Sequence, residues 1–332
     1  MRRVLVVGAG FFGRLVAARL AEIGCAPLVA TRRSGDLRLD AEDETSLREV
    51  LRSGDIVVDS AGPFATRSTR LVSVAMEVGC DVIDLAETLA WSEAILGLAQ
   101  RVSDAGIRVY PGCSAVAAVA GACLRASGID LPDSVDLFLA PASAETASPA
   151  TVRGFVASIG RPIRTLRDGR LVTVRGYAEA RAFPASRRSG GLVESAASVL
   201  LPRSWPGLRR AELWVDPNTP FGRASLSFAA AVPLLAAAAR AVAPRIGAGP
   251  FGRHDGVFAV VARDAVRERA FTFAAPRRSY LIAVEPAVIA AEALARGAAP
   301  VPGVILPHAQ VDPELLFARL RRLGIAVSAV AS

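Results

Sequence analysis

The chain reads VLVVGAGFFG from Val4 to Gly13 and continues directly into RLVAARLAEIG. The opening Val-Leu-Val-Val run is short and uninterrupted, which is typical of a strand buried on both faces of a parallel sheet. Gly8, Gly10 and Gly13 have the spacing G-x-G-x-x-G between this strand and a predicted helix. In a dinucleotide-binding turn the first glycine permits the tight turn, the second lets the backbone approach a pyrophosphate, and the third lets the helix pack on the strand. The stretch therefore predicts a nucleotide site with its anion at the helix N-terminus.

The glycine spacing alone is a weak signal, because any tightly packed strand-to-helix turn can use glycine. The strand before it and the helix after it favour the cofactor interpretation. Phe11 and Phe12 lie inside the same turn and are further candidate cofactor contacts.

A second strand-like segment, APLVATRR, ends in Thr31, Arg32 and Arg33. At this place an NAD site has an acidic residue that binds the ribose 2′-hydroxyl, whereas an arginine accommodates a 2′-phosphate. Two arginines without an acid therefore predict NADP(H) rather than NAD as the cofactor. The alternative is a solvated basic turn.

Strand-like and helix-like segments continue to alternate up to about residue 126. DIVVDSAGPF is a buried strand followed by a small, stiff loop of Ala61, Gly62, Pro63 and Phe64. This loop is expected at the carboxyl edge of the sheet, where open α/β folds bind their ligands. CDVIDLAE and IRVYPG predict further strands. Residues 1–126 are therefore predicted to form an α/β domain, a doubly wound parallel sheet of the Rossmann type.

Residues 127–299 are predicted to form a second, α+β domain with a mixed or antiparallel sheet. Its most apolar long stretch runs from Ala224 to Ala239, ASLSFAAAVPLLAAAA, and contains Pro233. This stretch is shorter than the ~20 residues that a spanning helix needs, so we expect no integral membrane segment. It predicts a buried helix, with contact to a membrane surface as the alternative.

The charged residues restrict the chemistry. Lys and Arg total 39 against 31 for Asp and Glu, giving a net charge of +8, and the chain contains no lysine. Lysine Schiff bases and lysine general bases are therefore excluded. The arginines are scattered, without interleaved aromatic residues or a recognition-helix signature. This pattern argues against a nucleic-acid partner and leaves small anionic molecules.

The four cysteines show neither a C-x-x-C motif nor a metal-ligand spacing. We therefore expect no metal site and a reduced, cytoplasmic protein. The first predicted strand starts at the fourth residue, so we also expect no signal peptide.

Several segments together carry a family resemblance. They are the glycine turn, LDAEDETSLREVL, DIVVDSAGPF, AMEVGCDVIDLAE, AGIRVYPGCS and the closing GVILPHAQVDPELLFARLRRLGIAV. In these segments the chain resembles the saccharopine dehydrogenase-like NADP-binding reductases. The resemblance implies a Rossmann domain interrupted by the second domain, with residues 300–332 returning to the first. It also implies a homodimer and hydride transfer from NADPH to a C=N or C=C bond of a small organic substrate, in a cleft between the domains.

The resemblance extends to individual positions. Those that hold the cofactor in the family are matched by Gly8, Gly10, Gly13, Arg32 and the loop 61–64. The turn at Gly112, Cys113 and Ser114 lacks the aspartate that the family often has there. The Arg and Lys set that binds amino acids in true saccharopine enzymes is also not recognisable, so saccharopine is not the expected substrate.

Four residues are candidates for catalysis. Asp84 and Glu87 match the family's acidic strand end near the nicotinamide, where they would poise an acid or hold a substrate amine; the alternative is that they cap the next helix. Tyr110 ends a predicted strand and could donate a proton, or could pack with its hydroxyl satisfied. His254 is a candidate general acid that Asp255 could orient, or a hydrated loop residue.

Hydride transfer requires a nicotinamide, a shaped dry pocket and at most one proton donor, because the cofactor carries the difficult chemistry. The sequence therefore predicts an NADP(H)-dependent oxidoreductase with a small-molecule substrate. Imine reduction is preferred over alkene reduction, since the GAGFFG turn looks closer to the amino-acid reductases of the family. The alternative is a non-catalytic NADP-binding sensor or scaffold protein.

Overall fold

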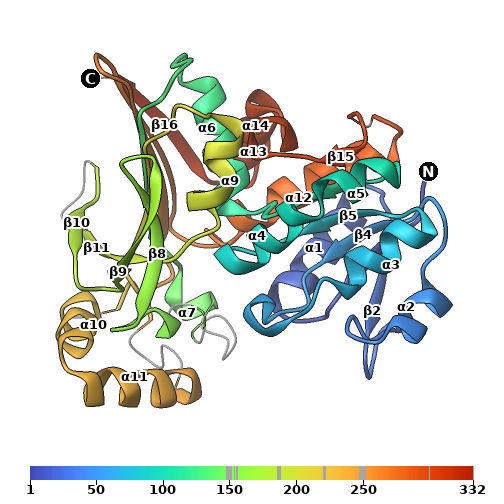
Figure 1. The fold of residues 1–332 in the computed structure, drawn as a ribbon, viewed down its shortest axis with the longest axis horizontal. Helices are drawn as coiled ribbons and strands as arrows, with labels where there is room; N and C mark the ends of the chain where they lie inside the picture. The colour runs from blue at the N-terminus through green and yellow to red at the C-terminus, as the bar shows by residue number, and fades with distance from the viewer. Residues whose placement is uncertain are drawn as a thin grey trace. The chain divides into compact units, whose positions relative to one another are not determined.

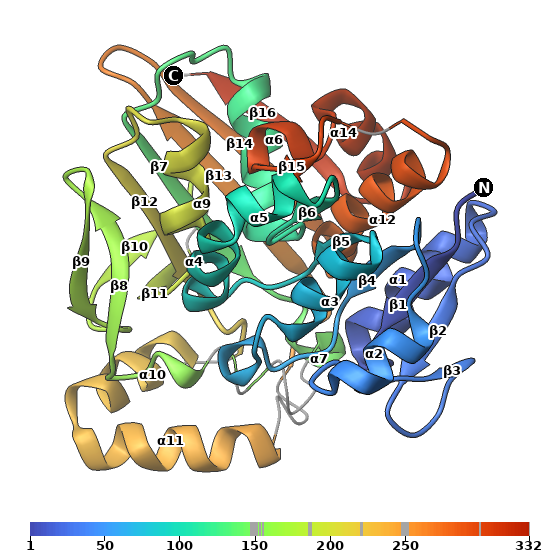
Figure 2. The same ribbon diagram turned by 45° about the vertical axis from the view of Figure 1, so that its right-hand side comes forward.

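The protein divides into two compact units, each built on its own sheet (Figures 1 and 2). The computed structural model describes residues 1–331 except 147–151, 153, 155, 185–187, 220–221, 247–251 and 299, and it describes only the backbone of residues 223 and 243–246. Unit 1 consists of Met1–Gly121 and Ala283–Asp312, and unit 2 of Ala122–Ile282 and Pro313–Ser332.

The sheet of unit 1 has seven strands in the order β15-β6-β5-β4-β1-β2-β3, and every pair is parallel. The strands are β1 (Val4–Val7), β2 (Leu28–Thr31), β3 (Leu37–Arg38), β4 (Ile56–Asp59), β5 (Asp81–Asp84), β6 (Arg108–Tyr110) and β15 (Gly303–Val304). The strand order reverses at β1, which lies between β4 and β2. The predicted doubly wound α/β fold is therefore confirmed.

Helices cover both faces of this sheet. The α-helices of unit 1 are α1 (Phe11–Glu22), α2 (Glu44–Val50), α3 (Arg70–Val78), α4 (Leu89–Gly97), α5 (Ala99–Asp104), α12 (Leu281–Ala295, whose first two residues belong to unit 2) and α13 (Pro307–Gln310). Short turns of other helix types are η1 (Phe64–Thr66) and the π-helix η2 (Ala115–Val119).

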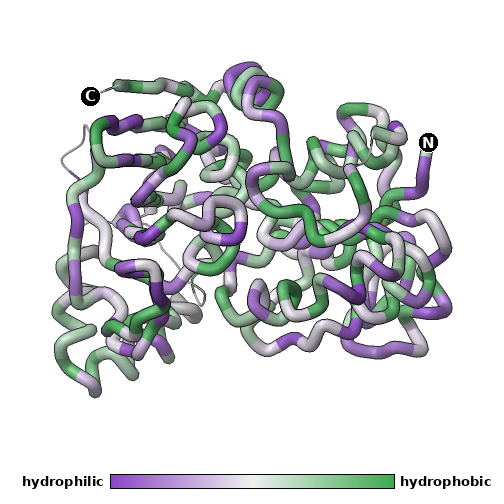
Figure 3. The backbone as a smooth tube through the Cα atoms, turned by 45° about the horizontal axis from the view of Figure 1, so that its top comes forward, coloured by the Kyte–Doolittle hydropathy of each residue, from purple (hydrophilic) through white to green (hydrophobic). Residues whose placement is uncertain are grey.

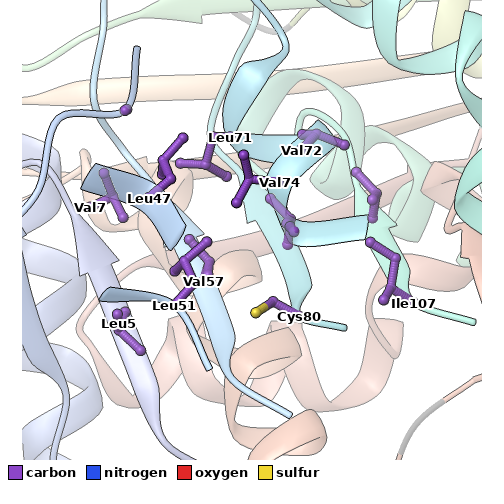
Figure 4. Packing of buried hydrophobic residues seen from close by; sticks show 14 of the residues in the cluster. Leu5, Val7, Leu47, Leu51, Val57, Leu71, Val72, Val74, Cys80 and Ile107 are labelled. Atoms are coloured by element: carbon purple, nitrogen blue, oxygen red, sulfur yellow. The ribbon is translucent and has the colours of Figure 1, made fainter. Parts of the chain in front are cut away.

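The apolar run of β1 divides its side chains between two cores, as the period of two in a strand requires. Leu5 and Val7 pack with residues of α2, α3, α4 and α5, a core that Figure 4 shows in part. Val4 and Val6 pack on the opposite face with residues of α1 and α12. Both faces are therefore closed to water, which explains why the sequence of this strand shows no polar alternation.

The sheet of unit 2 has nine strands and is mixed. Its main path is β10-β11-β12-β7-β13-β14-β16, and β8 pairs with both β12 and β9. β7 and β12 are parallel and the other pairs are antiparallel. The strands are β7 (Ser134–Ala140), β8 (Pro162–Arg167), β9 (Arg170–Arg175), β10 (Ala180–Ala182), β11 (Ser189–Val193), β12 (Arg210–Val215), β13 (Gly256–Arg263), β14 (Glu268–Ala275) and β16 (Ala326–Ala331). The predicted second α+β domain with a mixed sheet is confirmed.

The helices of unit 2 are α6 (Ala120–Ala126), α7 (Ser143–Thr146), α9 (Ala197–Ser204), α10 (Gly222–Ala231), α11 (Pro233–Ile246) and α14 (Pro313–Arg322). Hydrophobic and hydrophilic segments alternate along the chain in both units (Figure 3).

The C-terminal part divides differently from our expectation that residues 300–332 return to the first domain. Ala283–Asp312 belong to unit 1, whereas Pro313–Ser332 belong to unit 2. The reason is that β16 forms antiparallel hydrogen bonds with β14. The ring of Phe317 also packs against Phe271 and Phe273 of β14. The last segment therefore satisfies both its backbone and its apolar side chains in unit 2.

The expected buried helix at 224–239 is also wrong. The stretch forms two helices, because Pro233 has no N–H with which to continue α10 and instead begins α11. Several of its large apolar side chains are exposed, among them Phe228 and Leu234. Among the described residues, no helix is long and apolar enough to cross a membrane.

Candidate cofactor-binding site

The three glycines after β1 meet three different constraints. Gly8 has φ +97°, and a Cβ there would lie 3.0 Å from the Cα of Ala61. A Cβ on Gly13 would lie 2.0 Å from the carbonyl oxygen of Gly8 and 2.4 Å from the hydroxyl of Ser60. A Cβ on Gly10 would meet no atom within 4 Å. The fold itself therefore requires the first and third glycines, whereas the second faces open space where a ligand can approach the backbone.

Gly10 is also the N-cap of α1, and no side chain caps the helix from this position. The first turn of α1 contains no acidic residue. The positive end of the helix dipole and its first N–H groups are therefore left for an external anion. Phe11 and Phe12 begin the helix, and their rings form an edge-to-face pair with centroids 5.1 Å apart.

Ser60, which the sequence analysis did not select, ties the ends of β1 and β4 together. Its hydroxyl lies 2.9 Å from the carbonyl oxygen of Val7 and 3.1 Å from that of Gly8. These contacts fix the glycine turn beside the loop 61–64, at the point where the strand order reverses. Open α/β sheets bind their ligands at this point.

The loop 61–64 is held from below by an ion pair. Asp59, the last residue of β4, is fully buried, and Nη1 of Arg67 lies 2.8 Å from each of its carboxylate oxygens. The same Nη1 donates to the carbonyl oxygen of Ala61 at 2.7 Å, and the N–H of Ala61 donates to Asp59 at 3.0 Å. Burial raises the pKa of Asp59 although the guanidinium opposes the shift. Arg67 therefore joins the end of β4 to the first residue of the loop.

Two aromatic rings pack beside this ion pair. The guanidinium of Arg67 lies 5.3 Å from the ring centroid of Phe64 and 5.5 Å from that of Trp91, and the two rings are edge-to-face. Indole Nε1 of Trp91 donates to Asp84 at 2.9 Å. A continuous chain of contacts thus connects the loop 61–64 with the end of β5. The signal for it in the sequence is slight: a buried strand that ends in aspartate needs a cation nearby.

Asp84 is the centre of a second hydrogen-bond cluster. Besides Trp91, its carboxylate accepts from the N–H groups of Ala86 at 2.9 Å and Gly112 at 2.8 Å, and its carbonyl oxygen accepts from Cys113. The residue is fully buried, and burial raises the pKa of Asp84 to about 7. Asp84 therefore holds the turn after β6 in place, and both its carboxylate oxygens have partners inside unit 1.

Glu87 lies at the start of the next helical segment. Its carboxylate accepts from the N–H of Val116 at 3.1 Å, at the beginning of η2. Burial raises the pKa of Glu87, and bonds from Val116, Ser114 and Ala115 oppose the shift. This geometry is that of a helix cap, the alternative interpretation of Glu87 in the sequence.

Tyr110, at the end of β6, is buried within the core that α1 and α12 form with the sheet. Burial raises the pKa of its hydroxyl, so the proton is held more tightly than in water. Cys113 is buried in the same core, and burial raises the pKa of its thiol well above the usual value. These surroundings are those of packing residues.

Thr31, Arg32 and Arg33 lie at the carboxyl end of β2, next to β1 in the sheet. The hydroxyl of Thr31 accepts from the N–H groups of Arg33 at 3.4 Å and Ser34 at 2.9 Å, which shapes the turn. Both arginines are exposed. Within the described part of the chain, neither guanidinium has a hydrogen-bond or ion-pair partner. The nearest acid along the chain, Asp36, accepts from the N–H of Val29 at 2.8 Å.

His254 belongs to unit 2. Its imidazole is exposed, and Nδ1 lies 3.2 Å from a carboxylate oxygen of Glu145. Asp255, the partner expected from the sequence, instead accepts from Arg188 at 2.5 Å. That expectation is therefore wrong, because Arg188 takes up the neighbouring carboxylate and Glu145 is the acid that meets the histidine.

The comparisons with known proteins agree with this site. Residues 23–109 match the family model described as the saccharopine dehydrogenase NADP binding domain, so the resemblance predicted from the sequence is confirmed for this segment. The matched range runs from the end of α1 into β6 and contains the basic turn and the loop 61–64. It begins after the glycine turn, for which the evidence is the geometry above.

Solved structures share the fold. Amine dehydrogenase from Mycobacterium smegmatis is 12% identical, with a TM-score of 0.53 over 94% of this chain and 98% of that chain. The WlbA dehydrogenase from Thermus thermophilus, in complex with NAD and alpha-ketoglutarate, is 12% identical with a TM-score of 0.43 over 95% and 94%. UDP-N-acetylglucosamine 3-dehydrogenase from Acidithiobacillus ferrooxidans is 14% identical with a TM-score of 0.41 over 97% and 96%. No curated protein matches the chain by sequence.

Proposed function

We propose that this protein is an NADP(H)-dependent oxidoreductase that transfers a hydride between NADPH and a C=N or C=C bond of a small organic substrate. The observation that carries the proposal is the open position at Gly10, between two glycines that the fold itself requires. A nucleotide pyrophosphate fits there, against the first turn of α1. The match of residues 23–109 to an NADP-binding domain supports the same conclusion.

The choice of NADP(H) over NAD rests on the end of β2. Arg32 and Arg33 are exposed at the place where the 2′-position of the adenine ribose is recognised, and Asp36 is already bonded to the strand. Two guanidinium groups suit a phosphate ester, which they bind through paired hydrogen bonds. The loop 61–64 would contact the rest of the cofactor from the end of β4.

The bound nicotinamide would supply the hydride. Among the four candidates for catalysis, we propose that Asp84 and Glu87 position the turns beside the site and that Tyr110 packs in the core, because their polar contacts and burial are internal to unit 1. His254 has an exposed imidazole and is the remaining candidate proton donor. We prefer an imine substrate, as the family resemblance implies.

The resemblance also supports a homodimer, which sedimentation of the purified protein would test. The four cysteines are all free and buried, which supports a reducing compartment such as the cytoplasm.

The decisive experiment is a fluorescence titration of the purified protein with NADPH and with NADH. We expect tight binding of NADPH, weakened towards the NADH value by the paired change Arg32→Ala with Arg33→Ala. The matched control is Arg48→Ala with Arg70→Ala, which removes the same charge from two exposed, glutamate-paired positions of unit 1. If neither nucleotide binds, the proposed function is wrong. NADPH binding without oxidation by any imine or enoyl compound would instead support a non-catalytic sensor.

A further inference from the structure

The helical hairpin of α10 and α11 has an inverted distribution of side chains. Its buried positions are small: Ala230 and Ala236 are each 2% exposed and face Gly160, where a Cβ would lie 3.0 Å from the Cβ of Ala236. Its large apolar side chains point outward, and Phe228 is 66% and Leu234 83% exposed. A surface helix of a water-soluble domain normally buries its large apolar side chains.

The outward residues lie on both helices of the hairpin. Phe228 belongs to α10, and the other large exposed side chains, Leu234, Leu235 and Val242, belong to α11. In Figure 1 the two helices lie together at one end of unit 2, and in Figure 3 they are coloured mainly green. We call the exposed apolar residues of these two helices the hairpin surface. Neighbouring exposed residues of this kind mark interaction sites.

The charge around the hairpin surface has one sign. Between residues 217 and 254 the chain contains four arginines and neither aspartate nor glutamate. Arg240 also anchors the hairpin by donating to the carbonyl oxygen of Ile159. An apolar helix pair flanked only by cationic residues fits a surface that is apolar inside and anionic at its rim.

We propose that the hairpin surface docks on a membrane that carries anionic lipid. Phe228 and Leu234 would enter the boundary between headgroups and acyl chains, and the arginines would meet lipid phosphates and carboxylates. At 1.5 Å per residue, the 14 residues of α11 span about 21 Å, less than the ~30 Å of a hydrocarbon core, so the helix would lie in the interface.

A second copy of this chain fits the hairpin surface less well. A two-fold interface places the same patch on both sides, so this segment would bring arginines against arginines with no acid of its own to pair with them. An anionic bilayer presents no such repulsion.

The test is flotation of the full-length protein with vesicles of phosphatidylcholine, with and without phosphatidylserine. We expect binding to the anionic vesicles that weakens at high salt. The paired change Phe228→Ser with Leu234→Ser should weaken this binding by about tenfold or more. The control is Leu131→Ser with Val266→Ser, two residues of unit 2 that are 76% and 90% exposed outside the hairpin, and it should leave the binding unchanged.

Two outcomes would overturn the proposal. One is a protein that floats with neither kind of vesicle, or that floats equally well with Phe228→Ser and Leu234→Ser. The other is a dimer in sedimentation that this paired change converts to a monomer, which would assign the surface to a second copy. NADPH titration of the same variant reports separately on the cofactor site, because the changed residues lie outside unit 1.

Discussion

Nη1 of Arg67 lies 2.8 Å from both carboxylate oxygens of Asp59, and the two side chains are 7% and 0% exposed. The same atom donates to the carbonyl oxygen of Ala61. One ion pair therefore stabilises the end of β4 and the first residue of the loop 61–64. This arrangement makes the stability of unit 1 and the shape of the proposed cofactor site depend on a single guanidinium.

Replacing Arg67 with methionine should destabilise the protein by about 3–5 kcal/mol, because it leaves the buried Asp59 carboxylate uncompensated. It should also weaken NADPH binding, since Ala61 loses its donor. Thermal or denaturant unfolding and the fluorescence titration measure the two effects. Arg70→Met is the control: Arg70 is 51% exposed and 3.8 Å from Glu42, so it should cost less than about 1 kcal/mol. Equal losses in both variants would contradict the assigned role. Changing Asp59 to leucine in the Arg67→Met background should restore part of the stability.

Gly10 and Gly13 should separate binding from folding. Gly10→Ala introduces a Cβ that meets no protein atom, so it should cost at most about 1 kcal/mol at this N-cap while it weakens NADPH binding by obstructing the pyrophosphate. Gly13→Ala places a Cβ 2.0 Å from the Gly8 carbonyl oxygen and should destabilise the protein by about 1–3 kcal/mol or more. Unfolding curves and titrations on both variants check this. Unchanged NADPH affinity in Gly10→Ala would remove the main support for the cofactor site.

Asp84 should make the stability depend on pH. Its pKa is about 7 in the folded protein and about 3.9 in an unfolded chain, so the folded state binds more protons between these values. The free energy of unfolding should therefore fall as the pH rises from about 4 to about 7, by up to about 1.4 kcal/mol per pH unit from this group.

Asp84→Asn should remove this contribution to the slope, whatever it does to the absolute stability. Urea unfolding at a series of pH values measures the slope. Asp104→Asn, which removes one exposed carboxylate of unit 1, is the control and should leave the slope as in the wild type. The pKa assignment fails if Asp84→Asn and Asp104→Asn have the same pH dependence.

Asp136 should be a stability determinant of unit 2. It is fully buried on β7 and is bonded by Arg181, by Arg210 at 3.3 Å and by Arg263 at 2.6 Å. Asp136→Asn should cost about 2–3 kcal/mol, because three guanidinium groups lose one shared anion, while their partial exposure limits the penalty. Asp168→Asn, at a carboxylate that is 82% exposed and 3.7 Å from Arg209, should have little effect on denaturant unfolding. A similar loss in both variants would argue against the cluster.

The sequence by itself determined the architecture of the N-terminal unit and the position of its glycine turn. A strand buried on both faces must be apolar at every position, and a turn with φ +97° at Gly8 or with a backbone atom 2.0 Å from the Cβ position of Gly13 must have glycine. These requirements act within a few residues, so the sequence displays them directly. The mixed sheet of the second unit was predictable for the same reason, from the composition of its strands.

Only the tertiary structure decided which residues of different elements meet. Arg67 was one scattered arginine among many until the fold placed it on Asp59, and Asp84 acquired its partners from η1's neighbour Trp91 and from the turn after β6. The destination of residues 313–332 and the outward orientation of Phe228 and Leu234 depended on packing against distant strands and on Gly160. The physical reason is that periodicity records how strongly a residue avoids water, whereas the partner that it contacts is fixed by the packing of the whole unit.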